Sequence, residues 1–502
     1  MISNLAAADL LGATLAQTDY FPRLPQQRRL YEAARTAILL QQLSPGSKLP
    51  STRNLANELG IARNTVIAAF EQLAAEGFVV SSTGSGTYVS ASLPSTAQPK
   101  RKLDGNAEVV PGTPPNGFST LSKRGAQLTE FAAGTRYEIQ PFAPGEADFS
   151  VFPFKLWQRL QNRVWREARP DLLDYGQAGG YLPLRRAIAE YLRVSRSVKV
   201  SIEQVMITIG TQQSLDLCAL LLADVGDTTW VENPCYWGAR RIFESCEVSL
   251  HPVAVDAEGI APSEADLATN PRLIYVTPSH QYPTGVVMSL ARRRMLLDLA
   301  VRKGAWILED DYDSEFRYTG RPLAALQGLD TQGRVVYMGT FSKVLYPGIK
   351  VGYLVAPPAL VDSFKAALYD LQRPGQLMLQ AALADFIALG HFATHIRKIR
   401  QSYGAKRELL RKTLVAHLGE AAPISGEESG LHLVVEFPDH VDDEALARLA
   451  AESGIAVNAL SQYYLEPPVR RGLLVGYAYV PAEKIIYYGK LLAHVIQAGL
   501  RL

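Results

Sequence analysis

A serine and a lysine, Ser342 and Lys343, stand side by side between an apolar run and a turn that contains Pro347 and Gly348. A lysine amine forms a Schiff base with an aldehyde, and it does so best where desolvation or neighbouring charges keep it partly unprotonated. Most lysines that follow a strand are simply solvated. The pair therefore predicts a covalent attachment point for an aldehyde only if the chain supplies partners for it elsewhere.

A glycine turn at Gly210 precedes Thr211 and Gln212, directly after the apolar run of residues 205–209. Such a turn at the start of a helix presents backbone amides and a hydroxyl group to a phosphate. Gly-Thr also begins many ordinary helices, in which the turn only caps the first N–H groups. A phosphate site is predicted here on the condition that the other parts of a cofactor site accompany it.

An aromatic pair and an acidic cluster follow two further apolar runs. Tyr236 and Trp237 come after residues 228–231, where an aromatic ring can stack on a planar ligand, and Asp310 lies between acidic neighbours at the end of residues 306–309. Paired acids at a strand end suit magnesium, and a single carboxylate facing a protonated pyridine nitrogen explains them equally well. A phosphate loop, an aromatic ring, a carboxylate and a lysine are the parts that a pyridoxal phosphate site requires.

The elements that must position these residues alternate along the chain beyond residue 129. The expected strands are residues 205–209, 228–231, 273–276, 306–309, 335–338 and 351–355, and the helices between them include residues 214–222 and 290–303. This alternation predicts an α/β fold with a mainly parallel sheet, in which functional residues gather at the carboxyl ends of the strands.

The first organised unit is expected over residues 25–92 and reads as three short helices followed by a hairpin. Ser51 can cap the second helix, and the third begins with Arg63, Asn64 and Thr65, whose side chains are free for contacts. Two short helices with a tight turn read as a helix-turn-helix. Guanidinium and carboxamide groups recognise guanine and adenine in the major groove, so the unit is predicted to bind double-stranded DNA.

This unit resembles the GntR type of bacterial winged helix-turn-helix regulator. The resemblance is carried by Leu-Pro-Ser-Thr-Arg at 49–53, Arg-Asn-Thr-Val at 63–66, residues 73–77 and Gly-Ser-Gly-Thr at 84–87. The polar hairpin tip, residues 81–86, would lie along the phosphate backbone as a wing. The DNA contacts that the resemblance implies are Ser51, Arg53, Arg63, Asn64, Thr65, Gly84 and Gly86.

Residues from about 142 to 502 resemble the fold type I aminotransferase family, and with the winged helix they give the arrangement of the MocR subgroup of GntR regulators. The resemblance implies a large domain and a smaller C-terminal α+β part, about residues 360–502. It also implies that Lys343 forms the internal aldimine of pyridoxal 5'-phosphate. Its further implied contacts are Asp310 on the pyridinium nitrogen, Tyr312 on the ring hydroxyl, Tyr236 on the ring face, Gly210, Thr211, Gln212, Ser342 and Lys350 on the phosphate, and Tyr175 on the phosphate of the partner subunit.

Three positions depart from the aminotransferase pattern. Lys350 replaces an arginine on the phosphate, which exchanges a bidentate fork for a point charge. Tyr282 stands where many aminotransferases have an asparagine. Leu474 falls where they carry the arginine that clamps the substrate carboxylate, and Arg470 and Arg471 are nearby alternatives for that role. Loss of the clamp predicts vestigial transamination, because positioning is a large part of catalysis.

Composition and charge limit the possible partners, cellular setting and domain organisation of the protein. The 502 residues carry a net charge of +2, which excludes a chain that is basic throughout and leaves room for one basic surface. Three cysteines without metal or redox spacing predict a reducing, cytoplasmic setting. Residues 1–24 contain one mildly apolar stretch that Asp9 interrupts, so an amphipathic helix is expected rather than a signal peptide, and no membrane association. Residues 93–128, rich in proline and glycine, predict a flexible linker before the unit of residues 129–502.

The sequence thus predicts a transcriptional regulator that senses an amine, an amino acid or the cofactor itself through the aldimine at Lys343. An effector amine is expected to displace Lys343, to close the small domain on the large one and to shift the winged helices between two spacings. A head-to-tail homodimer that reads paired half-sites is expected. Two alternatives stay open: a working aminotransferase with an appended DNA-binding domain, and a cofactor-free DNA-binding protein whose α/β domain only dimerises.

Overall fold

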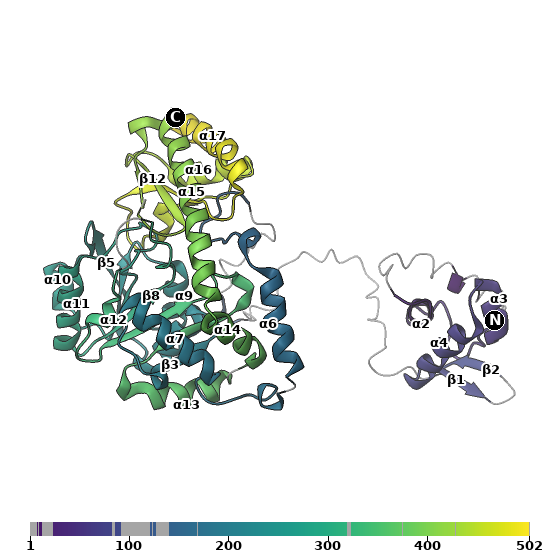
Figure 1. Ribbon diagram of the computed structural model, residues 1–502. Helices are drawn as coiled ribbons and strands as arrows, with labels where there is room; N and C mark the ends of the chain where they lie inside the picture. The colour runs from purple at the N-terminus through teal and green to yellow at the C-terminus, as the bar shows by residue number, and fades with distance from the viewer. Residues whose placement is uncertain are drawn as a thin grey trace. The chain divides into compact units, whose positions relative to one another are not determined.

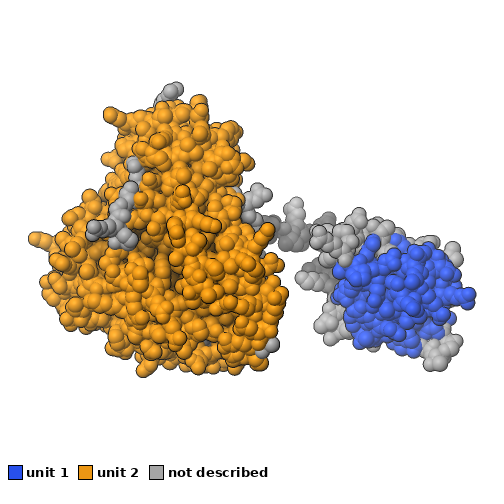
Figure 2. Space-filling model, in the orientation of Figure 1, with its two compact units in different colours: residues 1–118 blue, residues 119–502 orange. Residues whose placement is uncertain are grey.

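Two compact units make up the chain, residues 1–118 and residues 119–502 (Figures 1 and 2). The computed structural model describes residues 8, 10–12, 24–82, 86–91, 121–122, 124–126, 140–167, 169–318, 323–373, 375–426 and 428–500. Gly84 of the expected wing and most of the expected linker lie outside these residues. Each unit is therefore described by itself.

The first unit has the expected order of helices followed by a hairpin (Figure 1). Its elements are α2 (Gln26–Leu39), α3 (Thr52–Leu59), α4 (Arg63–Ala75), β1 (Val79–Ser82) and β2 (Gly86–Val89). The Ser51 hydroxyl accepts a hydrogen bond from the Asn54 N–H at 3.2 Å, and Gly60 ends α3 in the left-handed conformation, as the sequence predicts. Leu30, Val66 and Phe70 are buried in one core between the helices.

The hairpin differs from the sequence expectation at its tip. The sequence predicts Ser81 in the polar tip, but Ser81 belongs to β1 and pairs with Thr87 of β2, and the two hydroxyl oxygens lie 3.3 Å apart. The strands therefore reach further toward the tip than the hydrophobic pattern suggests, because a cross-strand pair of hydroxyl residues extends a ladder as well as an apolar pair does.

The second unit is built on one eight-stranded sheet. Its strands are β3 (Val205–Thr208), β4 (Thr228–Asn233), β5 (Ser249–Asp256), β6 (Gly259–Ile260), β7 (Leu273–Val276), β8 (Trp306–Asp311), β9 (Val335–Thr340) and β10 (Gly352–Val355). They lie in the order β3-β10-β9-β8-β7-β4-β5-β6. The pairs within β9-β8-β7-β4-β5 are parallel, and β10 runs antiparallel to both of its neighbours. The expected α/β fold with a mainly parallel sheet is confirmed.

Strand β5 was not expected from the sequence. Only Val253 in this strand is fully buried, and His251 and Pro252 interrupt the apolar run. β5 lies near an edge of the sheet, paired with the two-residue strand β6, so it does not need the continuous apolar sequence of a central parallel strand.

Helices pack on both sides of this sheet (Figure 1). They are α6 (Phe154–Arg166), α7 (Leu182–Arg196), α8 (Thr211–Leu222), α9 (Trp237–Ser245), α10 (Glu264–Ala268), α11 (Leu290–Lys303), α12 (Leu326–Leu329), α13 (Val361–Gln372) and α14 (Leu377–Ala388). Alternate residues of β9 enter different apolar clusters, Val336 and Met338 in one and Tyr337 in another. Both faces of the sheet are therefore buried, as the near-continuous apolar strands require.

A second, smaller sheet completes the unit. Its strands β11 (Ile424–Ser425), β12 (His432–Phe437), β13 (Asn458–Ala459) and β14 (Arg471–Gly476) are antiparallel in the order β11-β12-β14-β13. The helices α15 (His391–Leu418), α16 (Asp443–Glu452) and α17 (Ala482–Gly499) accompany it, and the long α15 leads to it from α14 (Figure 1). In the described part of the chain no single helix is long and apolar enough to cross a membrane, although one bent pair, Leu377–Ala388 with His391–Ala421, passes by length and composition.

Candidate functional site

The candidate residues lie together at the carboxyl ends of the parallel strands of the large sheet, which form one edge of that sheet. β3 is antiparallel to β10, and β10 is antiparallel to β9, so β3 and β9 end at the same edge as β8, β7 and β4. β10 begins at this edge, where Gly352 pairs with both Thr340 and Thr208. The turn before β10, which carries Lys350, is therefore brought beside the loops that follow β3 and β9.

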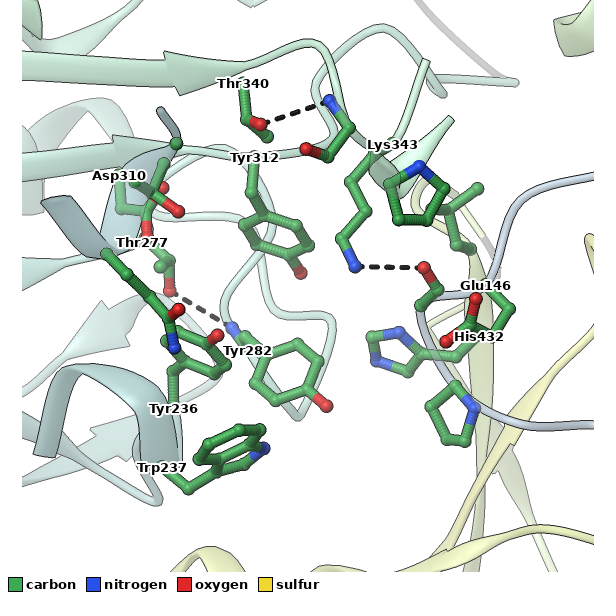
Figure 3. A pocket seen from close by; sticks show the side chains of 18 of the residues that line it. Glu146, Tyr236, Trp237, Thr277, Tyr282, Asp310, Tyr312, Thr340, Lys343 and His432 are labelled. Carbon is green, nitrogen blue, oxygen red and sulfur yellow. Dashed lines mark hydrogen bonds between the residues drawn. The ribbon is translucent and has the colours of Figure 1, made fainter. Parts of the chain in front are cut away.

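A cavity of about 400 Å³ lies at this edge (Figure 3). Of the predicted cofactor residues, those that line it are Gly210, Thr211, Gln212, Tyr236, Asp310, Tyr312, Ser342, Lys343 and Lys350. The sequence did not reveal that Glu146, Thr277, His432 and Asn458 also line it. Glu146 comes from an irregular segment, and His432 and Asn458 come from the small sheet, so no local pattern connects them with the lysine.

Lys343 extends into the cavity from the turn after β9 (Figure 3). Its Nζ donates a hydrogen bond to the Gly145 carbonyl oxygen at 2.9 Å. Gly145 has φ +79°, and a Cβ at this position would lie 3.0 Å from Nζ. Enclosure in the cavity lowers the pKa of Lys343, against the opposing effect of the nearby carboxylates of Glu146, Asp313 and Asp310. The amine is therefore more often unprotonated than a solvated lysine, as condensation with an aldehyde requires.

Asp310 is the carboxylate of the cavity. The Tyr275 hydroxyl donates to its Oδ2 at 3.0 Å, whereas its buried Oδ1 has no hydrogen-bond partner among the described residues. Burial raises the pKa of Asp310 to about 7 despite the bond from Tyr275. A buried carboxylate oxygen without a partner is costly unless a ligand supplies a donor, and a protonated ring nitrogen is such a donor.

The acidic neighbours of Asp310 point elsewhere, because successive side chains of a strand alternate between the two faces of the sheet. Glu309 accepts hydrogen bonds from the first backbone amides of α12, including that of Leu326 at 2.7 Å. Asp311 accepts from Arg196 Nε at 2.7 Å, and both side chains are buried. The three acids therefore serve three separate roles, and the magnesium interpretation loses its paired ligands.

The N-terminus of α8 forms one end of the cavity. Gly210 precedes this helix with φ 132°, a conformation that favours glycine. A Cβ at Gly352 would lie 2.8 Å from Gly210 Cα, so a glycine at 352 permits the loop to approach β10. Lys350, exposed and in the left-handed conformation with φ 47°, lines the cavity nearby. The Gly210 N–H donates to the Thr208 hydroxyl at 3.4 Å, and the helix N-terminus that follows, with a cation beside it, is an arrangement that suits an anion.

Tyrosine side chains, among them Tyr236, Tyr282 and Tyr312, line other walls of the cavity. Tyr236 and Tyr282 meet edge to face with ring centroids 5.6 Å apart (Figure 3). The Tyr312 hydroxyl lies 3.0 Å from His280 Nδ1, and the same nitrogen lies 2.9 Å from the buried Asp313 carboxylate. These contacts hold the Tyr312 ring in place, because His280 and Asp313 are both buried.

The C-terminal arginines turn away from the cavity. Arg470 pairs with Glu436, and Arg471 lies 3.4 Å from the buried Asp443 carboxylate. Leu474 is fully buried in a small apolar cluster. No arginine within the described ranges lines the cavity. Neither Arg470 nor Arg471 is therefore in place as the carboxylate clamp, and no other described arginine replaces the one missing at position 474.

Tyr175 lies outside the cavity of its own chain. It is 56% exposed, and the Arg373 guanidinium lies 4.7 Å from the centre of its ring. Its predicted contact with the phosphate of a partner subunit stays a prediction.

The DNA-contact residues predicted in the first unit are displayed at the surface. Arg53, Arg63 and Asn64 are exposed, and Thr65 is half-buried at the start of α4. The Arg63 Nε donates to the Thr52 hydroxyl at 3.4 Å, which links α4 to the beginning of α3.

The hairpin contacts the segment before α3 through Lys48. A Cβ at Gly86, where φ is +115°, would lie 2.8 Å from Lys48 Cε. The Leu49 N–H also donates to the Thr87 carbonyl at 2.8 Å. The segment before α3 and strand β2 therefore hold each other in place, so helices and hairpin form one surface.

The fold and site define a class of protein, a winged-helix DNA-binding unit joined to an aminotransferase-like unit. Residues 26–89 match the bacterial regulatory proteins of the gntR family, and residues 144–483 match the aminotransferases of class I and II. The kynurenine aminotransferase of Pyrococcus horikoshii has a similar structure, with a TM-score of 0.67, 26% identity and coverage of 77% of this chain and 98% of that one.

The whole chain also has relatives with both units. It is 41% identical to the probable rhizopine catabolism regulatory protein MocR of Rhizobium meliloti, over 91% of this chain and 90% of that protein. It is 31% identical to the HTH-type pyridoxine biosynthesis transcriptional regulator PdxR of Corynebacterium glutamicum, over 89% and 91%. The chain belongs to the MocR-type GntR family of transcriptional regulators.

Proposed function

We propose that the aminotransferase-like unit binds pyridoxal 5'-phosphate at Lys343, senses a primary amine or amino acid there, and so controls how the winged-helix unit binds its operator in the cytoplasm. When bound, this cofactor supplies an aldehyde that condenses reversibly with primary amines. The observation that carries the proposal is the unpaired, buried Asp310 Oδ1, which shares one cavity with the Lys343 amine and the N-terminus of α8.

The residues of the cavity fit this group in distinct roles. Asp310 would accept a hydrogen bond from the ring nitrogen, and Tyr312 would donate to the ring hydroxyl. Tyr236 would contact the ring. The groups that would hold the phosphate lie in the loop Gly210, Thr211 and Gln212, together with the Ser342 hydroxyl and the Lys350 ammonium. Lys350 contributes a point charge where an arginine would supply a planar fork, so it holds the phosphate with less directional specificity.

Competition between an effector amine and the Lys343 amine is the sensing event. His432 and Asn458 reach the cavity from β12 and β13 of the small sheet, whereas Lys343 and Asp310 come from the large sheet. A ligand in the cavity therefore contacts both sheets, and it shifts their relative arrangement by the difference in its affinity for the two arrangements.

A homodimer couples this event to paired half-sites on DNA. Trp165, Leu173 and Tyr175 are exposed by 63%, 68% and 56%, which gives a short stretch of large apolar and aromatic side chains suited to a subunit contact. In a head-to-tail arrangement Tyr175 completes the phosphate site of the partner subunit.

The direct test is to titrate the cofactor-loaded protein with amines and to follow cofactor absorbance and operator binding on the same sample. The expected result is that each amine that changes the absorbance also changes the operator affinity, at the same half-saturating concentration. Spectral changes without any change in operator affinity would contradict the proposed coupling.

Substitution of Arg63 with alanine is expected to weaken specific operator binding by about 1 to 3 kcal/mol, because an exposed arginine at the start of a recognition helix contacts base edges or phosphates. Binding is measured by fluorescence anisotropy at fixed salt, with cofactor absorbance as a check on folding. Arg302→Ala, a change at an exposed arginine of α11 in the other unit, is the control and is expected to leave both readouts unchanged. Loss of absorbance in Arg63→Ala would indicate unfolding instead.

Transamination is expected to be far slower than about 1 per second with any amino acid and oxo acid pair, because ordinary enzymes of this chemistry reach that rate and this cavity lacks a carboxylate clamp. Steady-state assays over a panel of donors and acceptors measure it. Turnover at or above that rate would favour the alternative function of a working aminotransferase.

A further inference from the structure

The charges of the cavity are unsuited to a carboxylate. Among the cavity-lining residues that the structure describes, the cationic side chains are Lys343, Lys350 and, if protonated, His432. Burial lowers the pKa of His432 to about 3, so it is neutral at physiological pH. The proposed function engages Lys343 with the aldehyde and Lys350 with the phosphate. The charged side chain that remains for an effector is the carboxylate of Glu146.

The His432 side chain, on the same side of the cavity as Glu146, also offers an acceptor. The carbonyl oxygen of Pro283 lies 2.9 Å from His432 Nε2 and so requires the proton on that nitrogen, which leaves Nδ1 as an acceptor. Figure 3 shows Glu146 and His432 on the same side of the Lys343 amine. An effector carboxylate placed there would meet a carboxylate and a ring nitrogen that both lack a proton to donate.

Position 474 completes this environment. His432 pairs with Gly476 and Val434 pairs with Leu474 in the β12–β14 ladder, so Leu474 lies on the same face of the small sheet as His432, which lines the cavity. Leu474 is fully buried with Val434 and Tyr463, and Tyr282 packs against this cluster. The apolar side chain of Leu474, with Tyr282 between its cluster and the cavity, therefore occupies the position from which a basic side chain on β14 would reach the ligand.

We infer that the effector is a primary amine without a carboxylate on the amine-bearing carbon, whose other polar groups are hydrogen-bond donors. Glu146 attracts the ammonium and repels an adjacent carboxylate, and Leu474 offers such a carboxylate no counter-charge. This inference rests on the proposed function, because it names the class of amine that competes with Lys343.

The inference is tested with pairs of compounds, an amino acid and its decarboxylated amine, that differ only in the carboxylate. The cofactor-loaded protein is titrated with histamine and histidine, tyramine and tyrosine, 1,5-diaminopentane and lysine, and 2-aminoethanol and serine. Each half-saturating concentration from the absorbance change is divided by that of the same compound with free pyridoxal phosphate, which removes differences in intrinsic amine reactivity. The decarboxylated members are expected to bind about tenfold or more tightly than their partners, since an unpaired charge loses at least one charge-assisted hydrogen bond.

Two variants locate the cause. Glu146→Gln is expected to reduce the normalised preference for the decarboxylated members by about threefold or more, and Leu474→Arg to shift it further toward the amino acids. Glu483→Gln, at an exposed glutamate of α17, is the control and is expected to keep the wild-type preference. Because an arginine at a buried position can prevent folding, Glu146→Gln alone suffices to test the charge argument.

The possible outcomes distinguish failure of the inferred effector class from failure of the proposed function. Equal or tighter normalised binding of the amino acids by the wild-type protein would overturn the inference and leave the proposed function standing. An unchanged preference in Glu146→Gln would overturn the assignment of Glu146. No absorbance change with any of the eight compounds at high concentration would overturn the proposed function itself.

Discussion

Replacing Lys343 with alanine is expected to abolish the effector response of operator binding. The wild-type amine makes one hydrogen bond, from Nζ to the Gly145 carbonyl at 2.9 Å, so its removal costs at most about 1 kcal/mol of folding stability and the protein stays folded. What the variant loses is the amine with which an effector competes. The cofactor can then be held only by its non-covalent contacts, and the effector no longer displaces anything.

The measurement compares operator affinity with and without a saturating effector amine, together with the absorbance of the bound cofactor. Lys490→Ala, at an exposed lysine of α17, is the matched control and is expected to behave as the wild type. Effector-dependent operator binding that is unchanged in Lys343→Ala would exclude displacement of the lysine as the switch. A loss of operator binding in both variants would point to the assay instead of the site.

Replacing Asp310 with asparagine is expected to weaken cofactor binding by about 10- to 100-fold and to stabilise the cofactor-free protein. The weaker binding follows from loss of a charge-assisted hydrogen bond between the carboxylate and a protonated ring nitrogen, which contributes about 1.5 to 3 kcal/mol. The gain in stability follows from the buried Oδ1, which is charged and has no partner among the described residues until a ligand supplies one.

The stability gain of Asp310→Asn over the wild type is expected to increase with pH. Burial raises the pKa of Asp310 to about 7 in the folded protein, well above that of an unfolded aspartate. Between these two values the folded state binds more protons than the unfolded state, so stability falls as pH rises and the cost is complete above pH 7. Asparagine does not ionise, so the variant should gain about 2 to 4 kcal/mol at pH 8 and clearly less at pH 5.

Chemical denaturation of the cofactor-free proteins at the two pH values measures the gain. Glu309 also has a pKa raised to about 7 by burial, but it is common to both proteins and cancels in the difference between variant and wild type. The Asp310 charge contributes to the raised pKa of Glu232, so the measured gain includes the relief of that carboxyl group. A variant that is less stable than the wild type at pH 8 would contradict the assignment of Asp310 as an unpaired carboxylate. The expected result is that Asp310 lowers the stability of the cofactor-free protein and increases its affinity for the cofactor.

The sequence alone determined the local elements and the types of chemical group. The cap at Ser51, the end of α3 at Gly60 and the start of α4 at Arg63 follow from short-range hydrogen bonds and helical spacing, which the chain encodes within a few residues. The central strands were predictable for the same reason, because a strand buried on both faces needs a continuous apolar run. The marginal β5 (Ser249–Asp256), which is buried on few of its residues, and the two-residue β6 (Gly259–Ile260) were not predicted.

The tertiary structure decided which groups meet. The Gly210 loop follows the first strand of the sheet in sequence and Tyr236 follows the second, yet β3 and β4 are separated by four strands, and β10 places Lys350 between the loops after β3 and β9. Strand alternation is local, but the choice of Asp310 over its two acidic neighbours depends on which face of β8 borders the cavity.

The same holds for the residues that set the ligand class. Glu146, His432 and Asn458 are remote from Lys343 in sequence, and Arg470 and Arg471 turn toward acidic partners that lie in other segments of the small domain. Pairing between distant segments is fixed by the packing of whole sheets and by the need to give each buried charge a partner. No short stretch of sequence contains that information. The sequence indicated the missing clamp at Leu474, but only the folded chain shows that neither Arg470 nor Arg471 takes its place.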